Sequence, residues 1–599
     1  MFIKKEIKKF KGTTKTYVRI VESYRANGQN KHRAIKSYGA LEDQEHPEIF
    51  LRQVEADLKR LDQHKDQDIK IIIKAKENEL NASNNVSYNY GYQYLESIYD
   101  FLQIDAFLEK YQNELNSKER YSIGQIFKFL VYERILSPDS KRANVQRRKL
   151  YYTQSFNFSL DDVYRSLDLL APIYKDLQAH MRKRINTLNF ASMDYLYYDV
   201  TNYYCEIDFN DLLDGLRKRG VSKEHRLNPI VGLGLFMDSN GLPLAFQVFP
   251  GNTAESTTLI SGINEVKQQS HKKRILCVAD KGLNTTQNIR QLILNQDGYL
   301  FSQIIRGPKG KRFHDQLFSS EGWEEKINDE NEVIYRYKLY KDTITLKDEN
   351  NQKFEHQQKV LLYWSKEEFD MQQKKRLEQV SRAIKSLNNN AYQIEHSFKK
   401  YIKKTVDGKE TLSINQALID EESKYDGYFG LVTSELDFDH QQIRKTYANL
   451  WEIEDTFRVT KTNLEFRPIY HHKHEHILSH FLICFTSLII LRLFQYKLKG
   501  QGIHLSAERI INVLNKMNLE KTTKDVYHLH AISGAQAYRE IKNKDQAMVY
   551  TSTLSAEDMI EKDLKLIYLA FDVEVNEAYI KVEKFNRYLR NIKFHTTSA

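Results

Sequence analysis

Cysteine is scarce in this chain, and its scarcity excludes two classes of small domain. Among 599 residues there are only three cysteines, which are Cys205, Cys277 and Cys484. They lie far apart in the sequence and form no Cys-x-x-Cys pair. Disulfide frameworks and zinc knuckles need cysteines at short spacings, so we expect neither. The pattern fits a protein of the reducing cytoplasm.

Long apolar runs are also missing. The longest, residues 481–494, contains Thr486, Ser487 and Arg492, and it is shorter than the roughly 20 residues that cross a bilayer. We therefore predict a buried core helix there and no membrane partner. The first residues are charged and include no continuous apolar segment, so we expect no signal peptide. No Walker or dinucleotide-binding loop occurs, so no nucleotide cofactor is expected.

Basic charge is present instead, and it is concentrated at the start of the chain. The formal net charge is +10, and residues 1–40 hold eleven Lys or Arg against two Glu. This surplus predicts a partner rich in phosphate, although a solvated basic arm without a partner is the alternative. Polar and apolar residues alternate over 17–24 and 32–38 around an Asn-Gly turn, which predicts a small basic β-hairpin.

A helical region follows. Residues 47–82 are charged and helical in pattern, 81–89 resembles a linker, and helices dominate 95–185. Ser122 begins one helix, which Ser137-Pro138 ends, and Ser159 opens another. Short helices around a basic cluster suit a module that recognises DNA ends, and they equally suit a plain helical bundle. The cluster comprises Lys141, Arg142, Arg147, Arg148 and Lys149.

From residue 193 the pattern changes to extended runs that predict a mixed sheet. The order is β-β-β-α-β-α-β, an antiparallel meander followed by helix-linked strands, with helices on the faces of the sheet. The fully apolar run 275–279 is typical of a central strand. The predicted strands are 195–201, 230–237, 244–249, 274–279 and 299–305, and the helices between the later strands are 257–268 and 285–295.

Residues 308–424 break this alternation, and we predict that they form an insertion outside the sheet. Strand-like pieces lie among charged turns, and a long polar helix, 366–387, follows them. The remaining predicted elements are a strand at 428–433, helices at 441–466 and 477–494, and a helical region beyond 500 with one strand at 566–575.

The stretch 447–461 contains no Gly or Pro and reads as an amphipathic helix. At roughly 100° per residue, Leu450, Ile453, Phe457 and Leu464 share one apolar arc. A carboxylate with nearby cations suits a metal ion and a polyanion, whereas a surface ladder of ion pairs is the plain alternative. The adjacent polar arc consists of Glu454, Arg458, Lys461 and Glu465.

Three acids stand out by position. Asp199 ends the first strand, Asp280 ends the apolar strand, and Glu454 lies on the helix after the last strand. Such strand ends meet near the middle of the sheet, where a helix packed across it can present a third carboxylate. Three carboxylates repel one another unless a divalent ion neutralises them. Two ions about 4 Å apart can activate a water or a 3′-hydroxyl and stabilise the leaving oxygen of a phosphodiester. Taken singly, each acid can equally be interpreted as a surface residue or a helix-capping residue.

Tyr447, Glu454 and Lys461 match the signature Tyr-x2-Arg-x3-Glu-x6-Lys. The chain thereby resembles the bacterial insertion-sequence DDE transposases, which have a ribonuclease-H-like core. Further similar segments are 197–201, 278–282, 249–252, 464–471 and the basic N-terminal hairpin. Leu450 stands where the family has Arg, and Arg458 is our candidate to replace that phosphate contact. The family's β-rich insertion between its second and third acids accounts for the 173 residues between Asp280 and Glu454.

The resemblance implies that Asp199, Asp280 and Glu454 are catalytic and hold Mg²⁺ or Mn²⁺, as two ions. It implies that Tyr447 and Lys461, with Arg458, bind DNA. The implied reaction is strand cleavage at terminal inverted repeats of double-stranded DNA and strand transfer into target DNA, within a homodimeric synaptic complex of the bacterial cytoplasm, at the nucleoid.

Two alternatives share these features. One is a catalytically inactive transposase-derived protein that binds specific DNA sequences, and the other is a structure-specific nuclease. The histidines at 471, 472, 474, 476 and 480 include helical i, i+4 spacings, so a zinc site is a further alternative.

The fold class expected is α/β (α+β multidomain), a ribonuclease-H-like mixed sheet flanked by helices. The predicted domains are a basic hairpin (1–45), a helical DNA-binding region (46–190), a catalytic core (191–307 and 425–495), a β-rich insertion (308–424) and a helical C-terminal region (496–599).

Overall fold

The chain was analysed as a computed structural model, which divides it into two compact units. One comprises Met1–Ser87 and Glu520–Val526, and the other comprises Tyr88–Leu519 and Tyr527–Ala599. The structure describes all residues except 1, 11–12, 27–28, 45–46, 49, 53, 59–85, 116–119, 189–193, 213–214, 271–272, 389–397, 408, 524–525, 531–555, 574, 576–577 and 595–599. Most of the predicted helix at 47–82 and linker at 81–89 lies outside the described residues.

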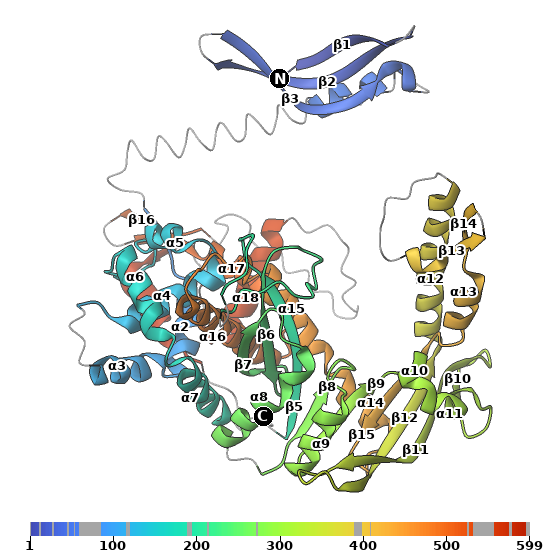
Figure 1. Cartoon of the computed structure of the whole chain (residues 1–599). Coiled ribbons are helices and arrows are strands. Elements are labelled where there is room, and N and C mark those ends of the chain that lie inside the picture. Colours follow the sequence, from blue (N-terminus) through green and yellow to red (C-terminus); the bar gives the residue numbers. More distant parts are fainter. Residues whose placement is uncertain are drawn as a thin grey trace. The chain divides into compact units, whose positions relative to one another are not determined.

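The first unit contains an antiparallel sheet of three strands, which Figure 1 shows in blue. Val18, Ile20 and Val54 form its small buried core. The predicted hairpin is therefore present, and a further strand at the start of the chain pairs with it. The strands are β1 (Phe2–Phe10), β2 (Thr13–Ala26) and β3 (Gln29–Ala40), followed by η1 (Leu41–Asp43).

Helices form the first part of the second unit. The Ser122 side chain accepts a hydrogen bond from the Gln125 backbone N–H, and Ser159 forms a capping box with Asp162, so both predicted helix starts are confirmed. After the short strand β4 (Ser87–Asn89), the helices are α2 (Tyr92–Phe101), α3 (Ile104–Glu114), α4 (Ile123–Leu136), α5 (Lys141–Arg147), α6 (Leu160–Leu170) and α7 (Tyr174–Asn186).

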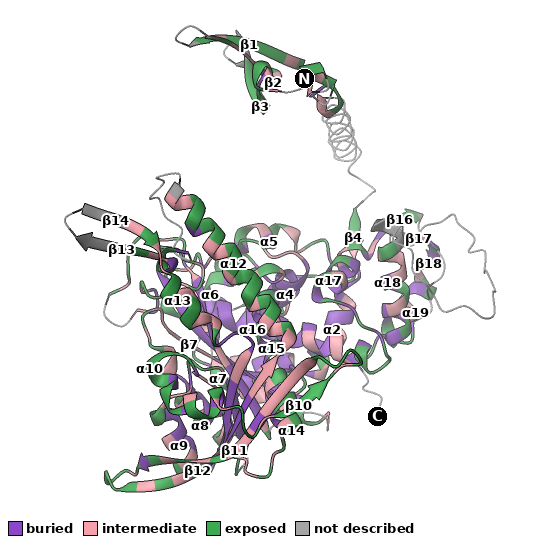
Figure 2. Cartoon of the chain, turned by 90° about the vertical axis from the view of Figure 1, so that its right-hand side faces the viewer, coloured by how far each residue is buried: buried purple, intermediate pink, exposed green. Residues whose placement is uncertain are grey.

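Four of these helices, α2, α4, α6 and α7, pack against α16 (His474–Lys499). Within the described residues, α16 is the one helix long and apolar enough to cross a bilayer, but 89% of its most apolar window is buried inside the protein. Figure 2 shows it in purple between other helices. The prediction of a buried core helix is confirmed.

The second unit also contains a mixed sheet of nine strands, in the order β10-β11-β12-β15-β9-β8-β5-β6-β7. Strands β5, β8 and β9 are parallel, and β6 and β7 continue the sheet antiparallel to their neighbours. The elements follow one another in the order that the sequence predicts. They are β5 (Tyr195–Tyr204), β6 (Ile230–Met237), β7 (Pro243–Pro250), η2 (Glu255–Thr257), α8 (Leu259–Ser270), β8 (Leu276–Ala279), α9 (Thr286–Leu294) and β9 (Gly298–Gln303).

The prediction that 308–424 lies outside the sheet is wrong. Strands β10 (Glu324–Ile327), β11 (Val333–Lys347) and β12 (Lys353–Ser365) extend the sheet, because β12 pairs with β15 (Tyr428–Thr433) and β15 pairs with β9. Apolar residues on both faces of β12 are buried, which requires cover on both sides. The rest of the segment comprises α10 (Gly307–Gly310), η3 (Lys311–Phe313), α11 (His314–Phe318), α12 (Lys366–Asn388), η4 (Lys399–Tyr401), β13 (Ile402–Asp407), β14 (Lys409–Ile414) and α13 (Gln416–Ser423).

The predicted helix 441–466 is two helices, α14 (His440–Ala448) and α15 (Trp451–Thr462). Asn449 ends the first helix, as residues that compete for backbone hydrogen bonds often do. The predicted strand at 566–575 is also wrong, because α18 continues to Ala570. The C-terminal elements are α17 (Ala507–Lys516), β16 (Asn518–Thr523), β17 (Val526–Leu529), α18 (Ala556–Ala570), β18 (Tyr579–Lys581) and α19 (Val582–Asn591).

Candidate active site

Two of the three predicted acids lie side by side on neighbouring strands, Asp199 within β5 and Asp280 directly after β8. The prediction that Asp199 ends its strand is wrong, because β5 continues to Tyr204. In the parallel pair β5–β8, Tyr198 is opposite Ala279. Asp199 and Asp280 are the next residues on the two strands. The Oδ1 atom of Asp199 accepts a hydrogen bond from the Val200 backbone N–H at 2.7 Å. The strand register therefore brings together two carboxyl groups that are 81 positions apart in the sequence.

The environment of Asp199 disfavours its negative charge. Burial is the largest cause and raises the pKa of Asp199 to about 6. The positive charge of Lys223 and the bond from Val200 oppose this shift, whereas the charges of Glu255 and Asp280 add to it. Burial therefore disfavours the ionised carboxylate of Asp199, and a bound cation would offset this cost.

The side of the sheet that carries the acids follows from strand alternation. Tyr198 and Val200 belong to the apolar cluster on one face of the sheet, so Asp199 between them points to the opposite face. Ala279 belongs to the same cluster as Tyr198, which places Asp280 on the same face as Asp199.

Helix α15 covers that face. Its residues Ile453 and Phe457 belong to the larger apolar cluster, together with Tyr197 and Tyr203 of β5 and Val278 of β8. Leu450 and Leu464 are buried in the same cluster, so the predicted apolar arc is confirmed. The helix that carries Glu454 therefore lies on the same side of the sheet as Asp199 and Asp280.

Two hydrogen bonds fix the direction of this covering segment. The Tyr197 hydroxyl donates to the Thr446 carbonyl at 2.9 Å, and the Tyr203 hydroxyl lies 2.7 Å from Thr460 Oγ1. The segment 446–460 therefore runs in the same direction as residues 197–203 of β5. Glu454 lies between the two contacts, at the level of the middle of β5. The Glu454 side chain is exposed, and it makes no hydrogen bond or ion pair with another described residue.

Tyr447 reaches the acids directly. It lies at the end of α14, which packs against β8 and β9, and its hydroxyl donates to Asp280 Oδ1 at 3.3 Å. Burial first, and then the charge of Asp280, raises the pKa of Tyr447 above its usual value. The side chain therefore stays a neutral phenol that can orient the carboxylate.

Lys461 lies on the same edge of α15 as Glu454, two turns further on. Its Nζ is 3.8 Å from Glu224 Oε1, and Glu224 is also paired with Arg467. Burial is the main cause that lowers the pKa of Lys461, while Glu224 and then Asp199 favour its charged form. Lys461 therefore lies near enough to Asp199 for the two charges to interact.

Three charged residues close to the predicted acids were not predicted from the sequence: Lys223, Glu224 and Glu255. The first two lie in the loop between β5 and β6, where no periodicity marks them. Lys223 Nζ is 3.2 Å from Glu255 Oε1, and a Cβ added at Gly282 would lie 3.8 Å from Glu255 Oε2. Glu255 therefore borders the turn that begins at Asp280. Glu255 lies three residues after the segment 249–252, and the similarity of that segment to the family was the one sequence feature that pointed to this region.

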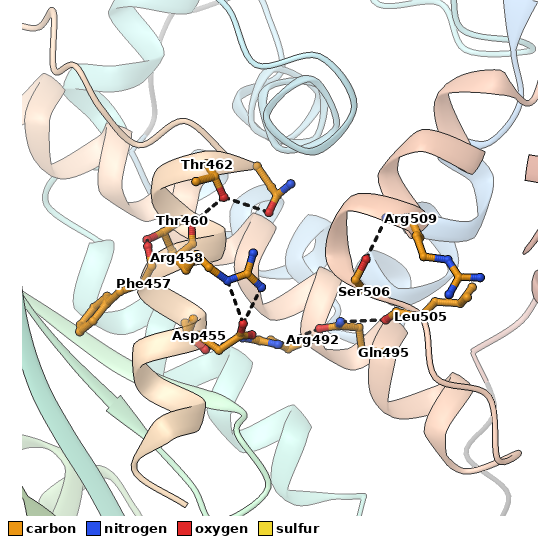
Figure 3. A network of polar contacts seen from close by, with 12 residues as sticks. Asp455, Phe457, Arg458, Thr460, Thr462, Arg492, Gln495, Leu505, Ser506 and Arg509 are labelled. Carbon is orange, nitrogen blue, oxygen red and sulfur yellow. Dashed lines mark hydrogen bonds and ion pairs between the residues drawn. The ribbon is translucent and has the colours of Figure 1, made fainter. Parts of the chain in front are cut away.

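Arg458 is engaged elsewhere. Its guanidinium pairs with Asp455 at 2.6 Å, and Asp455 also binds Arg492 at 2.9 Å, as Figure 3 shows. Arg458 remains exposed one turn after Glu454. Leu450, at the position of the family's Arg, is only 6% exposed and packs in the core, so this position is unavailable to a phosphate.

A basic cavity of about 1360 Å³ opens beside Asp280 and Tyr447. It lies between the sheet and the segment that carries α10 and α12. Glu368, Glu422 and Asp426 also line it, and Asp426 and Glu422 pair with Arg376 and Lys400. Its cationic lining residues are Lys281, Arg306, Lys309, Arg312, Lys375, Arg376 and Lys400.

The zinc alternative gains no support. In the part of the chain that the structure describes, the histidines between 471 and 480 do not bring three metal-ligand atoms together. His480 is buried and lies 3.1 Å from the Phe466 carbonyl. The three cysteines are free and buried.

The packing of α15 yields a first testable prediction. Ile453 is 1% exposed, so Ile453→Ala should lower the free energy of unfolding of this unit by about 3 kcal/mol and reduce any activity that depends on Glu454. Urea unfolding measures the first effect. Trp451→Ala is the control, because Trp451 is 56% exposed on the same helix. Equal losses in both variants would contradict this packing.

Comparisons with known proteins identify two segments. Residues 3–78 match the family model described as IS1634 family transposase, N-terminal domain, and residues 218–490 match the model described as transposase DDE domain. No curated protein matches the chain.

Among solved structures, the chain is similar to the cryo-EM structure of a piggyBac transposase synaptic complex with hairpin DNA, at 10% identity. The similarity covers 68% of this chain and 76% of that chain with a TM-score of 0.32, a level at which it supports no inference about this chain.

Proposed function

We propose that this chain, which is a DDE transposase of an insertion sequence, cuts DNA at the terminal inverted repeats of its element and joins the ends to target DNA through Asp199, Asp280 and Glu454. The observation that carries the proposal is the adjacency of Asp199 and Asp280 on neighbouring strands, under the helix that presents Glu454. Strand cleavage needs such a group of acids at one place.

The donor set fits a hard divalent cation. Carboxylate oxygens are the ligands that Mg²⁺ and Mn²⁺ prefer, and the raised pKa of Asp199 reflects a site that gains from added positive charge. Asp199, Asp280 and Glu454 would hold the metal, as two ions in our proposal. When bound, these ions would supply Lewis acidity to the attacking and leaving oxygens of the phosphodiester.

The arrangement of the sheet supports a ribonuclease-H-like core. Within it, the order β7-β6-β5-β8-β9 combines an antiparallel meander with parallel, helix-linked strands. Asp199 lies within β5 and Asp280 follows β8, and both strands are interior strands of the sheet. The predicted domains remain part of this proposal, except that β10, β11 and β12 of the segment 308–424 belong to the sheet of the core.

The other residues of the site would position the DNA. Tyr447 holds the Asp280 carboxylate through its hydroxyl. Lys461, now 3.8 Å from Glu224, would exchange this partner for a DNA phosphate, and exposed Arg458 would contact the backbone nearby. Such contacts position the strand but carry no sequence information.

Recognition of the ends is assigned to other parts of the chain. The N-terminal unit carries the surplus of basic residues, and it coincides with the matched transposase N-terminal domain. The helical region 95–185 is our second candidate. We propose a homodimer in the synaptic complex, and a location in the bacterial cytoplasm, where the DNA substrate lies.

A supercoiled plasmid that carries the gene with its flanking DNA tests the proposal. With Mg²⁺, we expect breaks at two positions that bound the element, and EDTA should abolish them. Specific binding without breaks would support the inactive DNA-binding alternative, and breaks at DNA junctions without inverted repeats would support a nuclease.

A further inference from the structure

A second cavity, of about 580 Å³, lies where the end of α4 and the start of α5 meet the segment between α15 and α16. Its lining is dominated by nitrogen-bearing side chains, although Asp139 and Glu465 also border it. We call this cavity the basic pocket. Its defining residues are Arg134, Lys141, Arg467, His471, His476 and His480.

Lys141 is the unusual member of the basic pocket. It is only 6% exposed, and its ammonium group makes no hydrogen bond or ion pair with another residue in the described part of the chain. Burial first, and then the charge of Arg134, lowers the pKa of Lys141 to about 7. A buried cation beside a second cation is costly unless an anion joins them.

The nearby acids do not supply this anion. Glu133 binds Arg147 at 2.9 Å and accepts a hydrogen bond from Tyr151 at 2.7 Å. Asp139 pairs with the same Arg147 at 3.2 Å. Both carboxylates are therefore committed to a partner other than Lys141.

Other groups of the basic pocket also have unused donors. Arg134 donates from Nη1 to the Glu465 carbonyl at 3.1 Å, but its buried Nε has no hydrogen-bond partner among the described residues. The buried Nε of Arg467 likewise has no hydrogen-bond partner among the described residues. Three cationic side chains thus converge with donor capacity that the described protein does not use.

The amino end of α16 adds to this field. Its N-cap residue Lys473 and its residue His476 line the basic pocket, and no side chain caps the helix there. A helix of 26 residues presents free backbone N–H groups and a partial positive charge at this end, which favours an anion.

We propose that the basic pocket binds a phosphodiester group of the DNA, with Lys141 as its central cation. The inference rests on the proposed function, because the anion is taken from the DNA strand. Its place supports this source: Arg467 lines the basic pocket and pairs with Glu224, which is the partner of Lys461. A strand that passes Lys461 can therefore place a neighbouring phosphate in the pocket.

Lys141→Met tests this inference through the salt dependence of binding to a duplex oligonucleotide from the end of the element. Loss of one phosphate contact should reduce the slope of log K against log salt by about 0.9 and weaken binding about tenfold. Lys149→Met is the control, because Lys149 is exposed and does not line the pocket. Lys141→Arg should keep most of the affinity. Equal slopes in the Lys141→Met and Lys149→Met proteins would overturn the proposal.

Thermal unfolding of the DNA-free protein separates this role from a structural one. Lys141→Met should raise the Tm, because it removes a buried charge without a partner; a lower Tm, or a chain that does not fold, would contradict the proposal. Inorganic phosphate is a further probe of the pocket. If it raises the Tm of the unsubstituted protein, but Lys141→Met leaves the slope of log K against log salt for DNA unchanged, the pocket is a site for free phosphate and the proposal is overturned.

The same binding measurements in an Asp199→Asn background without metal keep the two proposals apart. If the unsubstituted protein with Mg²⁺ never cuts the plasmid but the Lys141 slope effect persists, the basic pocket stands and the cleavage proposal fails. If cleavage occurs and the slope effect is missing, the basic pocket fails alone.

Discussion

Glu454→Gln is expected to leave DNA binding intact and to reduce strand cleavage by about 10³-fold. Gln keeps the shape of the side chain but removes the negative charge that would hold a divalent ion. Several kcal/mol of stabilisation of the transition state would be lost with that charge, which corresponds to this factor. Because Glu454 is exposed and makes no ion pair with another described residue, its substitution should not unfold the protein.

The measurement combines gel-shift titration with the plasmid cleavage assay. Glu452→Gln is the matched control on the same helix, because Glu452 is half-buried and lies beside Gly241, in the turn between β6 and β7. This turn follows the end of β6 that pairs with the start of β5, away from Asp199. Cleavage that persists in Glu454→Gln would remove Glu454 from the site, while equal losses in both variants would indicate a general effect on α15.

Most elements of the core could be predicted because their signals are local. Alternation and apolar runs identify β5, β6 and β8, and the acids stand out because they follow such strands. The burial of Ile453 and Phe457 follows from helical periodicity in the same way. These features depend on residues that are close in sequence, and the sequence shows them directly.

Pairing between distant strands could not be predicted. Residues 333–340 and 359–364 have a strand pattern, but the pattern does not name a partner. The partner of β12 is β15, more than 60 residues further along the chain. The segment therefore reads as an insertion although its strands extend the core sheet. The contact between Tyr447 and Asp280 could not be predicted for a similar reason, because only tertiary packing brings these two residues together.

The charged residues of loops were equally hidden. Lys223 and Glu224 reach the site from a loop without periodicity, and their roles depend on contacts with Glu255 and Lys461. Lys141 belongs to a basic cluster of the sequence, and the structure buries it. A run of charged residues is visible in the sequence, but whether each side chain is buried depends on how the helices pack.

Asp199→Asn is expected to abolish cleavage and yet to stabilise the metal-free protein by on the order of 2 kcal/mol at pH 7.5. The pKa of Asp199 is raised to about 6, above its unfolded value near 3.9. The ionised carboxylate therefore destabilises the folded state above about pH 6, and this cost is lost as the pH falls toward 4. Asn removes the charge and with it the cost.

Urea unfolding at pH 7.5 with and without Mg²⁺ measures this effect. The unsubstituted protein should gain stability when Mg²⁺ is added, because the ion binds only the folded site, and the Asn variant should gain much less. At pH 4 the two metal-free proteins should be nearly equal in stability, since Asp199 is then largely protonated in the folded state. Asp297→Asn is the contrasting control, because that buried acid is bound to Lys267 at 2.8 Å and its loss should destabilise. If Asp199→Asn also destabilised the metal-free protein, the carboxylate would be a structural group and the metal site would have to lie elsewhere.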